Sequence, residues 1–274
     1  MVMSVQTNVM SLNAQKNLYQ TQNRLESSMS RLSSGYRITK AGDDAAGLGV
    51  SANLVAQIRS YGQAARNAAD GVSLVQTAEG GTAEVSNILT RMRELAMQSA
   101  SDGIRDTERG YVQTEAAALI LEIDRIAQTA EYNGVMLLDG SAATLDFQVG
   151  IRATANDIIS FTTADMTTAT LGVDAVDLST KAGATTALAA LDTAIEGVSN
   201  VRAGFGAVGN RLQSVTATIN TAAENVSAAN SRIKDVDVAE ETSSLTRASV
   251  MMQAGISVLA QANQQPQMAL KLLG

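Results

Sequence analysis

Several residue types are missing from this sequence, and each absence limits the chemistry that the chain can perform. The 274 residues include no histidine, no cysteine and no tryptophan, and aromatic residues make up only 3% of the total. The chain therefore has no imidazole base, no thiolate nucleophile, no histidine or cysteine ligand for a metal, and no disulfide. A Ser/His/Asp set is excluded for the same reason. A cysteine-free chain is compatible with any redox compartment, so this count does not locate the protein.

Positive charge is scarce as well. The chain carries 20 Lys and Arg against 27 Asp and Glu, a net charge of −7 at pH 7, and it has no run of basic residues. We therefore expect no nucleic-acid interface, because such surfaces concentrate Lys and Arg. The charge-free segment 248–270 contains several glutamines, Asn263 and Pro266, which are costly in hydrocarbon, so we expect no membrane span there. Residues 1–16 lack the basic start, apolar block and cleavage site of a secretory signal peptide.

Apolar residues account for 45% of the chain, with a large share of alanine, and they follow heptad spacing in both halves. Such a composition fills thin, close-packed interfaces between helices. In the N-terminal half the steps of four and three slip by one place between Val75 and Ala78, as in a coiled coil with one stammer. The expected seam positions of three helices are Leu18, Leu25 and Leu32; Leu54, Ile58, Tyr61, Ala65, Ala68, Val72, Val75, Ala78, Thr82, Val85, Leu89, Met92 and Ala96; and Val112, Ala116, Leu119, Ile123, Ile126 and Ala130.

The C-terminal half repeats this pattern in two further helices. The expected seam of the first consists of Leu188, Leu191, Ile195, Val198, Val201, Phe205, Val208, Leu212, Val215, Ile219, Ala222, Val226 and Ile233. The expected seam of the final helix consists of Val238, Leu245, Met252, Ile256, Leu259, Pro266, Leu270 and Leu273. Its other faces carry further apolar residues such as Val250, Met251 and Val258, so we expect this helix to be buried on all sides.

The central segment has a different character. The stretches TLDFQVG (144–150) and DIISFTTADM (157–166) are short, rich in β-branched residues and bounded by turn residues, which predicts a small hairpin or two strands. The stretch YNGVMLLDG (132–140) predicts turns around a short extended piece. The predicted fold class is therefore mainly α: a long antiparallel coiled-coil-like helical bundle formed by the N- and C-terminal halves, with a small β-hairpin region in the middle.

Two interruptions lie at matching places in the two halves. The first is RLSSGYRITKAGDDAAGLGV (31–50), and the second lies within KDVDVAEE (234–241), at about residues 235–237. Helices far apart in the sequence must pair to bury their seams, so the termini should lie side by side and the two breaks at the same level. We therefore expect a joint between two helical domains, with Asp43 or Asp44 capping the helix that restarts there. The expected linker residues are Gly35, Gly42, Asp43 and Asp44.

The remaining motifs do not amount to a catalytic site. GFGAVG (204–209) matches the dinucleotide fingerprint G-x-G-x-x-G, but it lies within a heptad helix and not after a strand. The acidic pairs at 43–44, 235–237 and 240–241 flank helix starts, where capping and the helix dipole explain them without acid–base or metal chemistry. Asn225 begins an NVS sequon in mid-helix, a match that is frequent by chance. We expect no enzyme activity, no cofactor and no metal ion.

The segment LTRMRELAMQSASDG (89–103) contains residues that the seam does not use. They are Arg91, Arg93, Glu94 and Leu95. One reading is a solvated helix face with one stray leucine, and the other is a second contact surface for a neighbouring subunit or another protein. The periodicity on its own favours the solvated face.

Six longer stretches closely resemble the terminal signatures of bacterial flagellins, and they follow that family's order. They are SRLSSGYRITKAGDDAAGLGVSANL, NAADGVSLVQTAEG, RMRELAMQSA, YNGVMLLDG, FGAVGNRL and LAQANQQPQMALKLLG. The resemblance covers about residues 1–140 and 187–274. It implies a structural subunit, without catalysis, that self-assembles into the bacterial flagellar filament for swimming motility. A related flagellar axial protein, such as a hook–filament junction protein, is the alternative.

The resemblance also implies a domain plan. Flagellins pair their N- and C-terminal helices into an inner core domain on the lumen side of the filament and an outer core domain around it. Here the inner core domain is expected to comprise residues 1–35 and 236–274, with linkers at 36–43 and 233–235. The outer core domain is expected at 44–232, with helices at about 44–100, 105–131 and 187–232 and a β region at about 141–165.

Residue roles and partners complete these expectations. The apolar arms and the resemblance together suggest polymerisation contacts at Leu18, Leu25, Leu32, Leu259, Leu270, Leu272 and Leu273. The resemblance implies contacts with a vertebrate Toll-like receptor at Arg91, Leu95 and Glu115, with Leu95 and Glu115 facing outward. It further implies an export chaperone, the filament cap and hook–filament junction proteins as partners, and no nucleic acid or membrane. Type III export without a cleaved signal peptide would place the chain in the extracellular filament.

The terminal arms are expected to fold late. Residues 1–35 and 236–274 are apolar on more than one face, and a two-helix arm cannot cover those faces by itself. Short helices alone are marginal in water. We therefore expect both arms to be largely disordered in the exported monomer and to fold when neighbouring subunits bury them.

Overall fold

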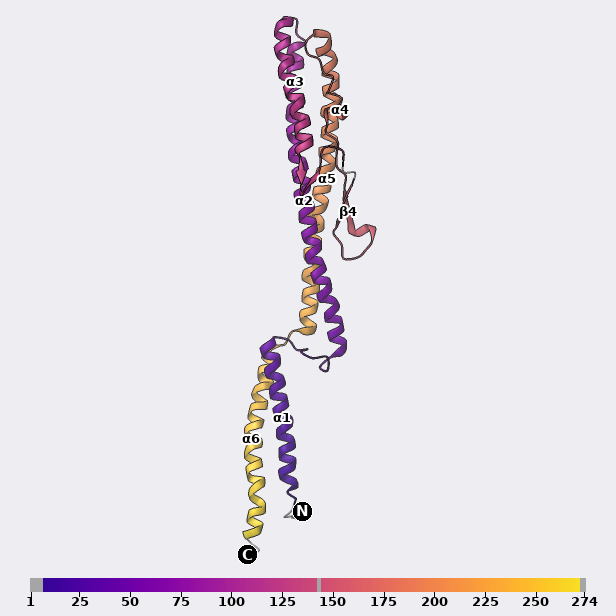
Figure 1. Cartoon of the computed structure of the whole chain (residues 1–274). Coiled ribbons are helices and arrows are strands. Elements are labelled where there is room, and N and C mark those ends of the chain that lie inside the picture. Colours follow the sequence, from indigo (N-terminus) through magenta and orange to yellow (C-terminus); the bar gives the residue numbers. More distant parts are fainter. Residues whose placement is uncertain (1–6, 142–143, 272–274) are drawn as a thin grey trace. The chain divides into compact units, whose positions relative to one another are not determined.

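The computed structural model describes residues 7–141 and 144–271, and the side chains within these ranges up to residue 264. Its elements are α1 (Val9–Ser34), α2 (Ala45–Ser99), α3 (Asp106–Thr129), β1 (Glu131–Tyr132), β2 (Val135–Met136), β3 (Leu145–Gln148), the 3-10 turn η1 (Ala155–Asp157), β4 (Ile158–Phe161), α4 (Thr168–Leu171), α5 (Lys181–Lys234) and α6 (Val238–Lys271) (Figure 1). Long helices that pack together, with two short antiparallel strand pairs in the middle of the chain, confirm the predicted fold class.

The chain divides into two compact units. The first consists of Met1–Ala56 and Asn225–Gly274, and the second of Gln57–Glu224. The first unit therefore holds α1, α6, the segment between α1 and α2, and the adjoining ends of α2 and α5. In the second unit α5 begins at Lys181, whereas the sequence placed its start near residue 187. The division into inner and outer core domains with their linkers stays a prediction.

In the first unit, α1 and α6 pack side by side as an antiparallel two-helix coil (Figure 1). At one end Asn8 Nδ2 donates to the carbonyl oxygen of Ala262 across 2.8 Å, and at the other Arg31 Nη1 lies 3.7 Å from Glu241 Oε2. The residues that are buried or half-buried between them recur every three or four positions. They are Ser11, Ala14, Leu18, Thr21, Leu25, Ser28 and Leu32 on α1, and Leu245, Ala248, Met252, Gly255, Leu259 and Ala262 on α6.

Two predicted seam positions of α6 are wrong. Val238 is 60% exposed and Ile256 is 54% exposed. Gly255 takes the place opposite α1, where a Cβ atom would lie 3.2 Å from Leu18 Cδ1, so the missing side chain allows the two helices to approach closely. Gly255 lies three residues after Met252 and therefore fits the spacing of the seam. A prediction that selects large apolar residues takes the next residue, Ile256, instead.

In the second unit α2 packs against both α3 and α5. The predicted heptad seams form one core with the hairpin region. Its most deeply buried helix residues are Ala68, Ala78, Val85, Leu89, Met92 and Ala96 on α2, Ala116, Ile123 and Ala127 on α3, and Ala184, Leu191, Val198 and Leu212 on α5. Helix α2 passes through the slip between Val75 and Ala78 without interruption, and both side chains are buried. The glycine-rich stretch 204–209 lies inside α5 with Phe205 in the core, as the heptad reading predicted.

Two hairpins cover this core. In β3 and β4, Leu145 pairs with Phe161 and Gln148 with Ile158, which confirms the predicted hairpin. The ring of Phe161 is fully buried, with its centroid 5.0 Å from that of Phe205, so the hairpin is anchored to α5. In β1 and β2 the connecting residues, Asn133 and Gly134, have φ of 50° and 78°, as a two-residue hairpin turn of the primed type requires.

Candidate assembly surfaces

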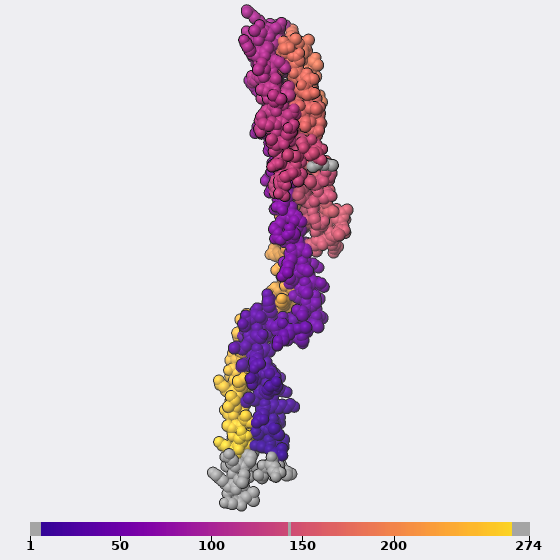
Figure 2. Space-filling model, viewed as in Figure 1, coloured from indigo at the N-terminus to yellow at the C-terminus, as the bar shows by residue number. Residues whose placement is uncertain are grey.

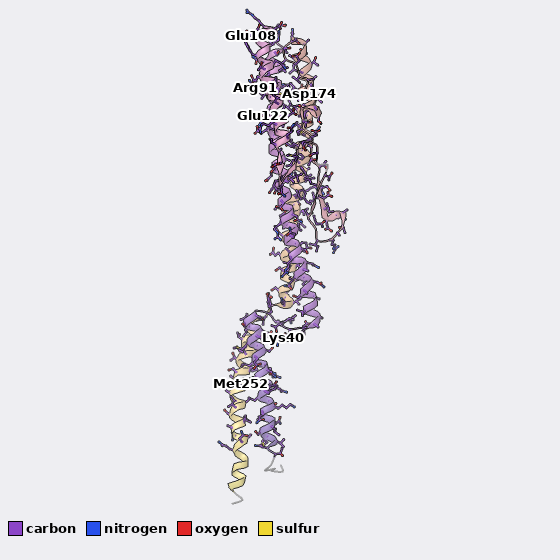
Figure 3. All side chains as sticks on the ribbon, viewed as in Figure 1. Lys40, Arg91, Glu108, Glu122, Asp174 and Met252 are labelled. Atoms are coloured by element: carbon purple, nitrogen blue, oxygen red, sulfur yellow. The ribbon has the colours of Figure 1, made fainter. Side chains whose placement is uncertain are left out.

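Both helices of the first unit expose large apolar side chains on the faces that point away from their common seam. The exposed fractions run from 39% at Met251 to 66% at Val9 and Tyr19. The members of this set are Val9, Met10, Leu12, Tyr19 and Met29 on α1, and Val238, Val250, Met251, Ile256 and Val258 on α6. Met252, marked on α6 in Figure 3, is half-buried next to the exposed Met251. Helices with apolar residues on two faces are suited to packing against further partners.

The leucines predicted for polymerisation have a different position from these exposed residues. Leu18, Leu25 and Leu32 of α1 and Leu259 of α6 are half-buried in the seam between the two helices of one chain. Contacts between copies would therefore use the opposite faces first. The side chain of Leu270, and Leu272 and Leu273 altogether, lie outside the described residues.

Polar contacts fix the register of the arm at its free end. The Asn8 Oδ1 oxygen accepts a hydrogen bond of 3.1 Å from the backbone N–H of Ser11 and so caps α1. The Ser11 hydroxyl donates to Asn263 Oδ1 at 2.8 Å. Because these bonds cross between helices that are far apart in the sequence, a slip of one helix along the other would break them.

The joint between α1 and α2 is held to the end of α5 by backbone hydrogen bonds. Helix α1 ends at Ser34 and is capped by Gly35, whose φ of 72° is left-handed. The Val236 N–H donates to the carbonyl oxygen of Gly35 at 3.0 Å, and the Arg37 N–H donates to that of Lys234 at 2.7 Å. The Lys234 ammonium also lies 4.2 Å from the ring centroid of Tyr36. The two predicted breaks are thus paired directly, within the first unit.

Two acidic residues of the joint, Asp44 and Asp237, cap helices, as predicted. Asp44 Oδ1 accepts from the Gly47 N–H at 2.8 Å at the start of α2, and Asp237 caps α6 in the same way. Asp43 instead closes the turn before α2. Hydrogen bonds donated by the backbone N–H groups of Lys40 and Thr39, and by the Thr39 hydroxyl, lower the pKa of Asp43.

Two of the predicted receptor-contact residues lie together on the surface of the second unit. The Arg91 guanidinium of α2 donates from Nη2 and Nε to Glu115 Oε1 of α3 at 2.9 and 3.0 Å, and from Nη1 to Glu94 at 3.0 Å. All three side chains are about half exposed or more, and Figure 3 marks Arg91 at the outer surface. Glu115 faces outward, as expected. The hydrogen bond to Glu115, followed by that to Glu94, raises the pKa of Arg91.

The prediction that Leu95 faces outward is wrong. Its side chain is only 2% exposed and belongs to the core. Helix α2 has two neighbours, α3 and α5, so its buried sector is wider than one heptad seam and takes in Leu95 next to Met92 and Ala96. The sequence signal for this was that Leu95 stands three residues after Met92 and directly before Ala96, which makes the apolar stripe wider than one seam.

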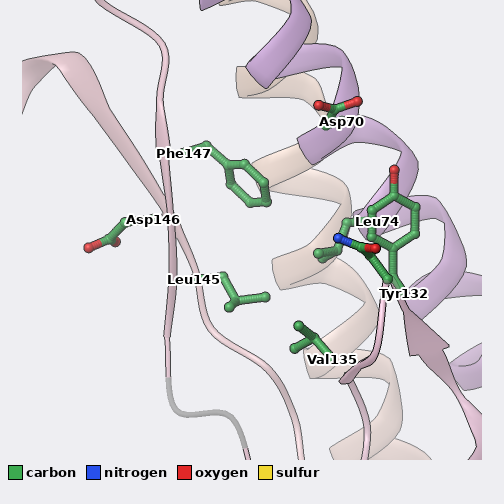
Figure 4. A pocket seen from close by; sticks show the side chains of 8 residues that line it. Asp70, Leu74, Tyr132, Val135, Leu145, Asp146 and Phe147 are labelled. Carbon is green, nitrogen blue, oxygen red and sulfur yellow. The ribbon is translucent and has the colours of Figure 1, made fainter.

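The second unit also carries an open hollow of about 670 Å³ that the sequence did not predict (Figure 4). Leu74 of α2, Tyr132 and Val135 of the first hairpin, and Leu145 and Phe147 of β3 provide its apolar walls. The hollow forms where α2, the β1–β2 hairpin and β3 pack together, so no local sequence pattern predicts it.

The described part of the chain has no group of His, Cys, Asp or Glu that could hold a metal ion. Within the same ranges no helix is both long and apolar enough to cross a bilayer. The surface features described above are the outer faces of the arm, the joint, the exposed ion pairs and the hollow.

Comparisons with known proteins show which family the chain resembles. The family models described as the bacterial flagellin N-terminal and C-terminal helical regions match residues 5–143 and 188–273. A flagellin of Halalkalibacterium halodurans is 41% identical over 271 residues, covering 99% of this chain and 100% of the relative. A flagellin of Bacillus subtilis is 40% identical over 305 aligned positions, covering 99% and 100%. The crystal structure of Bacillus cereus flagellin, at 32% identity and a TM-score of 0.51, covers 60% of this chain and 94% of that one.

These similarities agree with the geometry of the chain. The matched regions are the two halves that supply the paired helices of both units. Both relatives are named flagellins and align with this chain over their whole length, and no finding favours a hook–filament junction protein. The chain belongs to the bacterial flagellin family and is a structural subunit of the flagellar filament.

Proposed function

We propose that the chain builds its filament by packing the outer faces of α1 and α6 against neighbouring copies, with the arms on the lumen side and residues 44–232 outside. The observation that carries this proposal is the set of large apolar side chains that both arm helices expose. The same proposal includes type III export to the cell exterior, an export chaperone that covers the arms before assembly, and cap and hook–filament junction proteins at the filament ends.

Electron microscopy of two chain lengths tests the role of the arms. The full chain at high concentration should form long uniform filaments in negative stain. Removal of Met268–Gly274 should abolish filaments, because the arm loses part of its apolar surface, while the circular dichroism of the second unit persists. Persistent monomers of the full chain, or normal filaments from the shortened chain, would contradict the proposal.

We also infer that the arms order only on assembly. Each apolar side chain that a neighbour buries contributes roughly 1.5–3 kcal/mol before the cost of ordering the helix. In the free chain that contribution is missing for the exposed set on α1 and α6. Hydrogen exchange should therefore be fast across residues 236–264 in the monomer and slow in the filament; strong protection before assembly would contradict this.

We propose that Arg91 and Glu115 contact a vertebrate Toll-like receptor in the monomer, and that stacked subunits cover them in the filament. Leu95 supports the surface only from beneath, since it is buried. In a reporter-cell assay Arg91→Ala should signal more weakly than the parent, with Arg211→Ala on α5 as the control; equal signalling would remove the assignment.

A further inference from the structure

The hollow of the second unit has half-exposed apolar walls. Tyr132, Val135, Leu145 and Phe147 are each neither buried nor fully exposed. In Figure 4 the side chains of Leu145 and Phe147 point from β3 toward α2, with Leu74 and Tyr132 on the other side. Its volume of about 670 Å³ is large enough for an aliphatic side chain to enter between these walls. The described part of the chain places no side chain there.

The charge at the hollow is acidic. Two charged residues line it, Asp70 and Asp146. Asp146 points away in Figure 4 and accepts a hydrogen bond of 2.6 Å from the Ser160 hydroxyl. Asp70 stands at the rim of the hollow, exposed, and within the described ranges it forms no hydrogen bond or ion pair. A basic residue beside an apolar one is therefore the complementary occupant.

Helix α3 carries such a pair on its solvent face. Tyr111, Thr114, Ala118, Leu121 and Arg125 follow one another in steps of three or four and are all exposed. Leu121 is 71% exposed. Arg125, one turn further on, donates from Nε and Nη2 to Glu122 at 2.8 and 2.6 Å, which leaves its Nη1 hydrogens for a second carboxylate. The space-filling view shows α3 at the surface of its unit (Figure 2).

Leu121 cannot reach the hollow of its own chain. Gly81 of α2 faces Ala130, and Arg91 reaches Glu115, so the two helices run antiparallel and Leu121 lies level with about residue 87 of α2. The hollow lies at residues 70–74 of the same helix. With a rise of 1.5 Å per residue, the two positions are about 20–25 Å apart along α2.

We propose that this hollow receives Leu121 of a second copy of the chain, with that copy's Arg125 beside Asp70. The proposal rests on the filament-forming function and assigns one of its contacts. Since the inserted side chain and the hollow are different patches of one unit, the contact is heterologous and repeats from copy to copy into an open assembly instead of closing into a dimer. Copies in this contact are shifted by about 20–25 Å along α2.

Cysteine cross-linking tests the contact on an empty background, since the chain has no cysteine of its own. Filaments of the double variant Leu121→Cys, Leu145→Cys, treated with the thiol oxidant diamide, should give a ladder of covalent dimers, trimers and longer products. Each single variant should stop at dimers at most. The matched pair Tyr111→Cys, Leu145→Cys uses the same exposed stripe at the wrong level and should give no ladder. Filaments without a ladder from the first pair, or a ladder from the second alone, would overturn the proposal.

A charge exchange tests the polar half of the contact. Asp70→Arg and Arg125→Asp should each raise the critical concentration for polymerisation by about five- to tenfold, and the double variant should return it toward the parent value. Both sites are exposed, so circular dichroism of the monomers should not change. Single variants that polymerise like the parent would contradict this contact alone, whereas a parent chain that forms no filaments would contradict the proposed function.

Discussion

At the scale of single residues, Arg109 is the most deeply buried charged residue in the described ranges, with 9% of its side chain exposed. Its guanidinium donates to the carbonyl oxygens of Ser99 and Ser101 at 2.9 Å each and to Asp106 at 2.6 Å. These bonds close the turn between α2 and α3, where carbonyl groups at the end of α2 would otherwise lack donors. The planar guanidinium group can bond three acceptors at once because Nε, Nη1 and Nη2 each donate.

We therefore expect Arg109→Lys to destabilise the second unit although it keeps the charge. One ammonium group cannot replace three separate donors, and a buried carbonyl left without a partner costs about 1–3 kcal/mol. Urea unfolding followed by circular dichroism measures the change in the free energy of unfolding. Arg105→Lys, at the exposed start of α3, is the control and should leave that free energy nearly unchanged. Equal stability of the two variants would contradict the argument.

Asp102 provides a pH-dependent link between the α2–α3 turn and α5. The hydrogen bond of 2.6 Å from Lys181 Nζ, followed by the charge of that ammonium, lowers the pKa of Asp102. A carboxyl whose pKa is lower in the folded state stabilises that state above its unfolded pKa, and this contribution is lost as the pH falls through the folded pKa. Lys181→Met should raise the pKa of Asp102 back toward the ordinary value for aspartate in a carboxyl NMR titration. Lys181→Arg should keep it low.

At the scale of elements, the α1–α6 seam is thin. Between its leucines it contains Ser11, Thr21, Ser28, Gly255 and Ala262, which bury little apolar surface. Such a seam fixes register and close approach more than it supplies stability. The larger apolar surface of the same helices faces outward, so the stability of the arms is expected to come from neighbouring copies.

The close approach of α1 and α6 at this seam predicts the effect of a larger side chain at Gly255. Gly255→Val should block pairing of α1 with α6 and prevent filament growth, because even a Cβ atom at this position lies 3.2 Å from Leu18 Cδ1. Ala254→Val places the same side chain on the exposed face and lowers helix propensity, whereas Gly255→Val raises it, so propensity cannot explain a loss at Gly255. Sedimentation of polymer should separate the two: Ala254→Val near the parent level, Gly255→Val almost none. Equal polymer yields would contradict close packing at Gly255.

At the scale of the whole molecule, a change in the backbone conformation of the joint is expected to change the shape of the filament. Gly35 has a left-handed φ of 72°, whereas Gly42 has no such φ and open space around it. Gly35→Ala is therefore expected to strain the joint by about 1 kcal/mol or more and to alter the waveform of filaments and the swimming of cells. Gly42→Ala is the matched control and should change neither. A normal waveform in Gly35→Ala would argue against a shape-setting role.

The heptad spacing of apolar residues predicts most of the fold. The seams of α2, α3 and α5, the hairpin of β3 and β4 and the caps at Asp44 and Asp237 all follow from local spacing, because each depends on residues close in the chain. The prediction for Ile256 is wrong because Gly255 occupies the seam position. The prediction for Leu95 is wrong because α2 packs against two helices, α3 and α5. The hollow was missed because its walls come from three separate elements, and only the packed structure brings them together.

The thin seam of the arm has a consequence for how filaments begin. The first copies that meet have few neighbours to cover their outer faces, so each association is weak and short-lived. A copy that arrives at an existing end finds several neighbours already in place, and its arm gains its full contacts in one step. Growth should therefore show a lag, a concentration threshold and strong acceleration by added filament fragments.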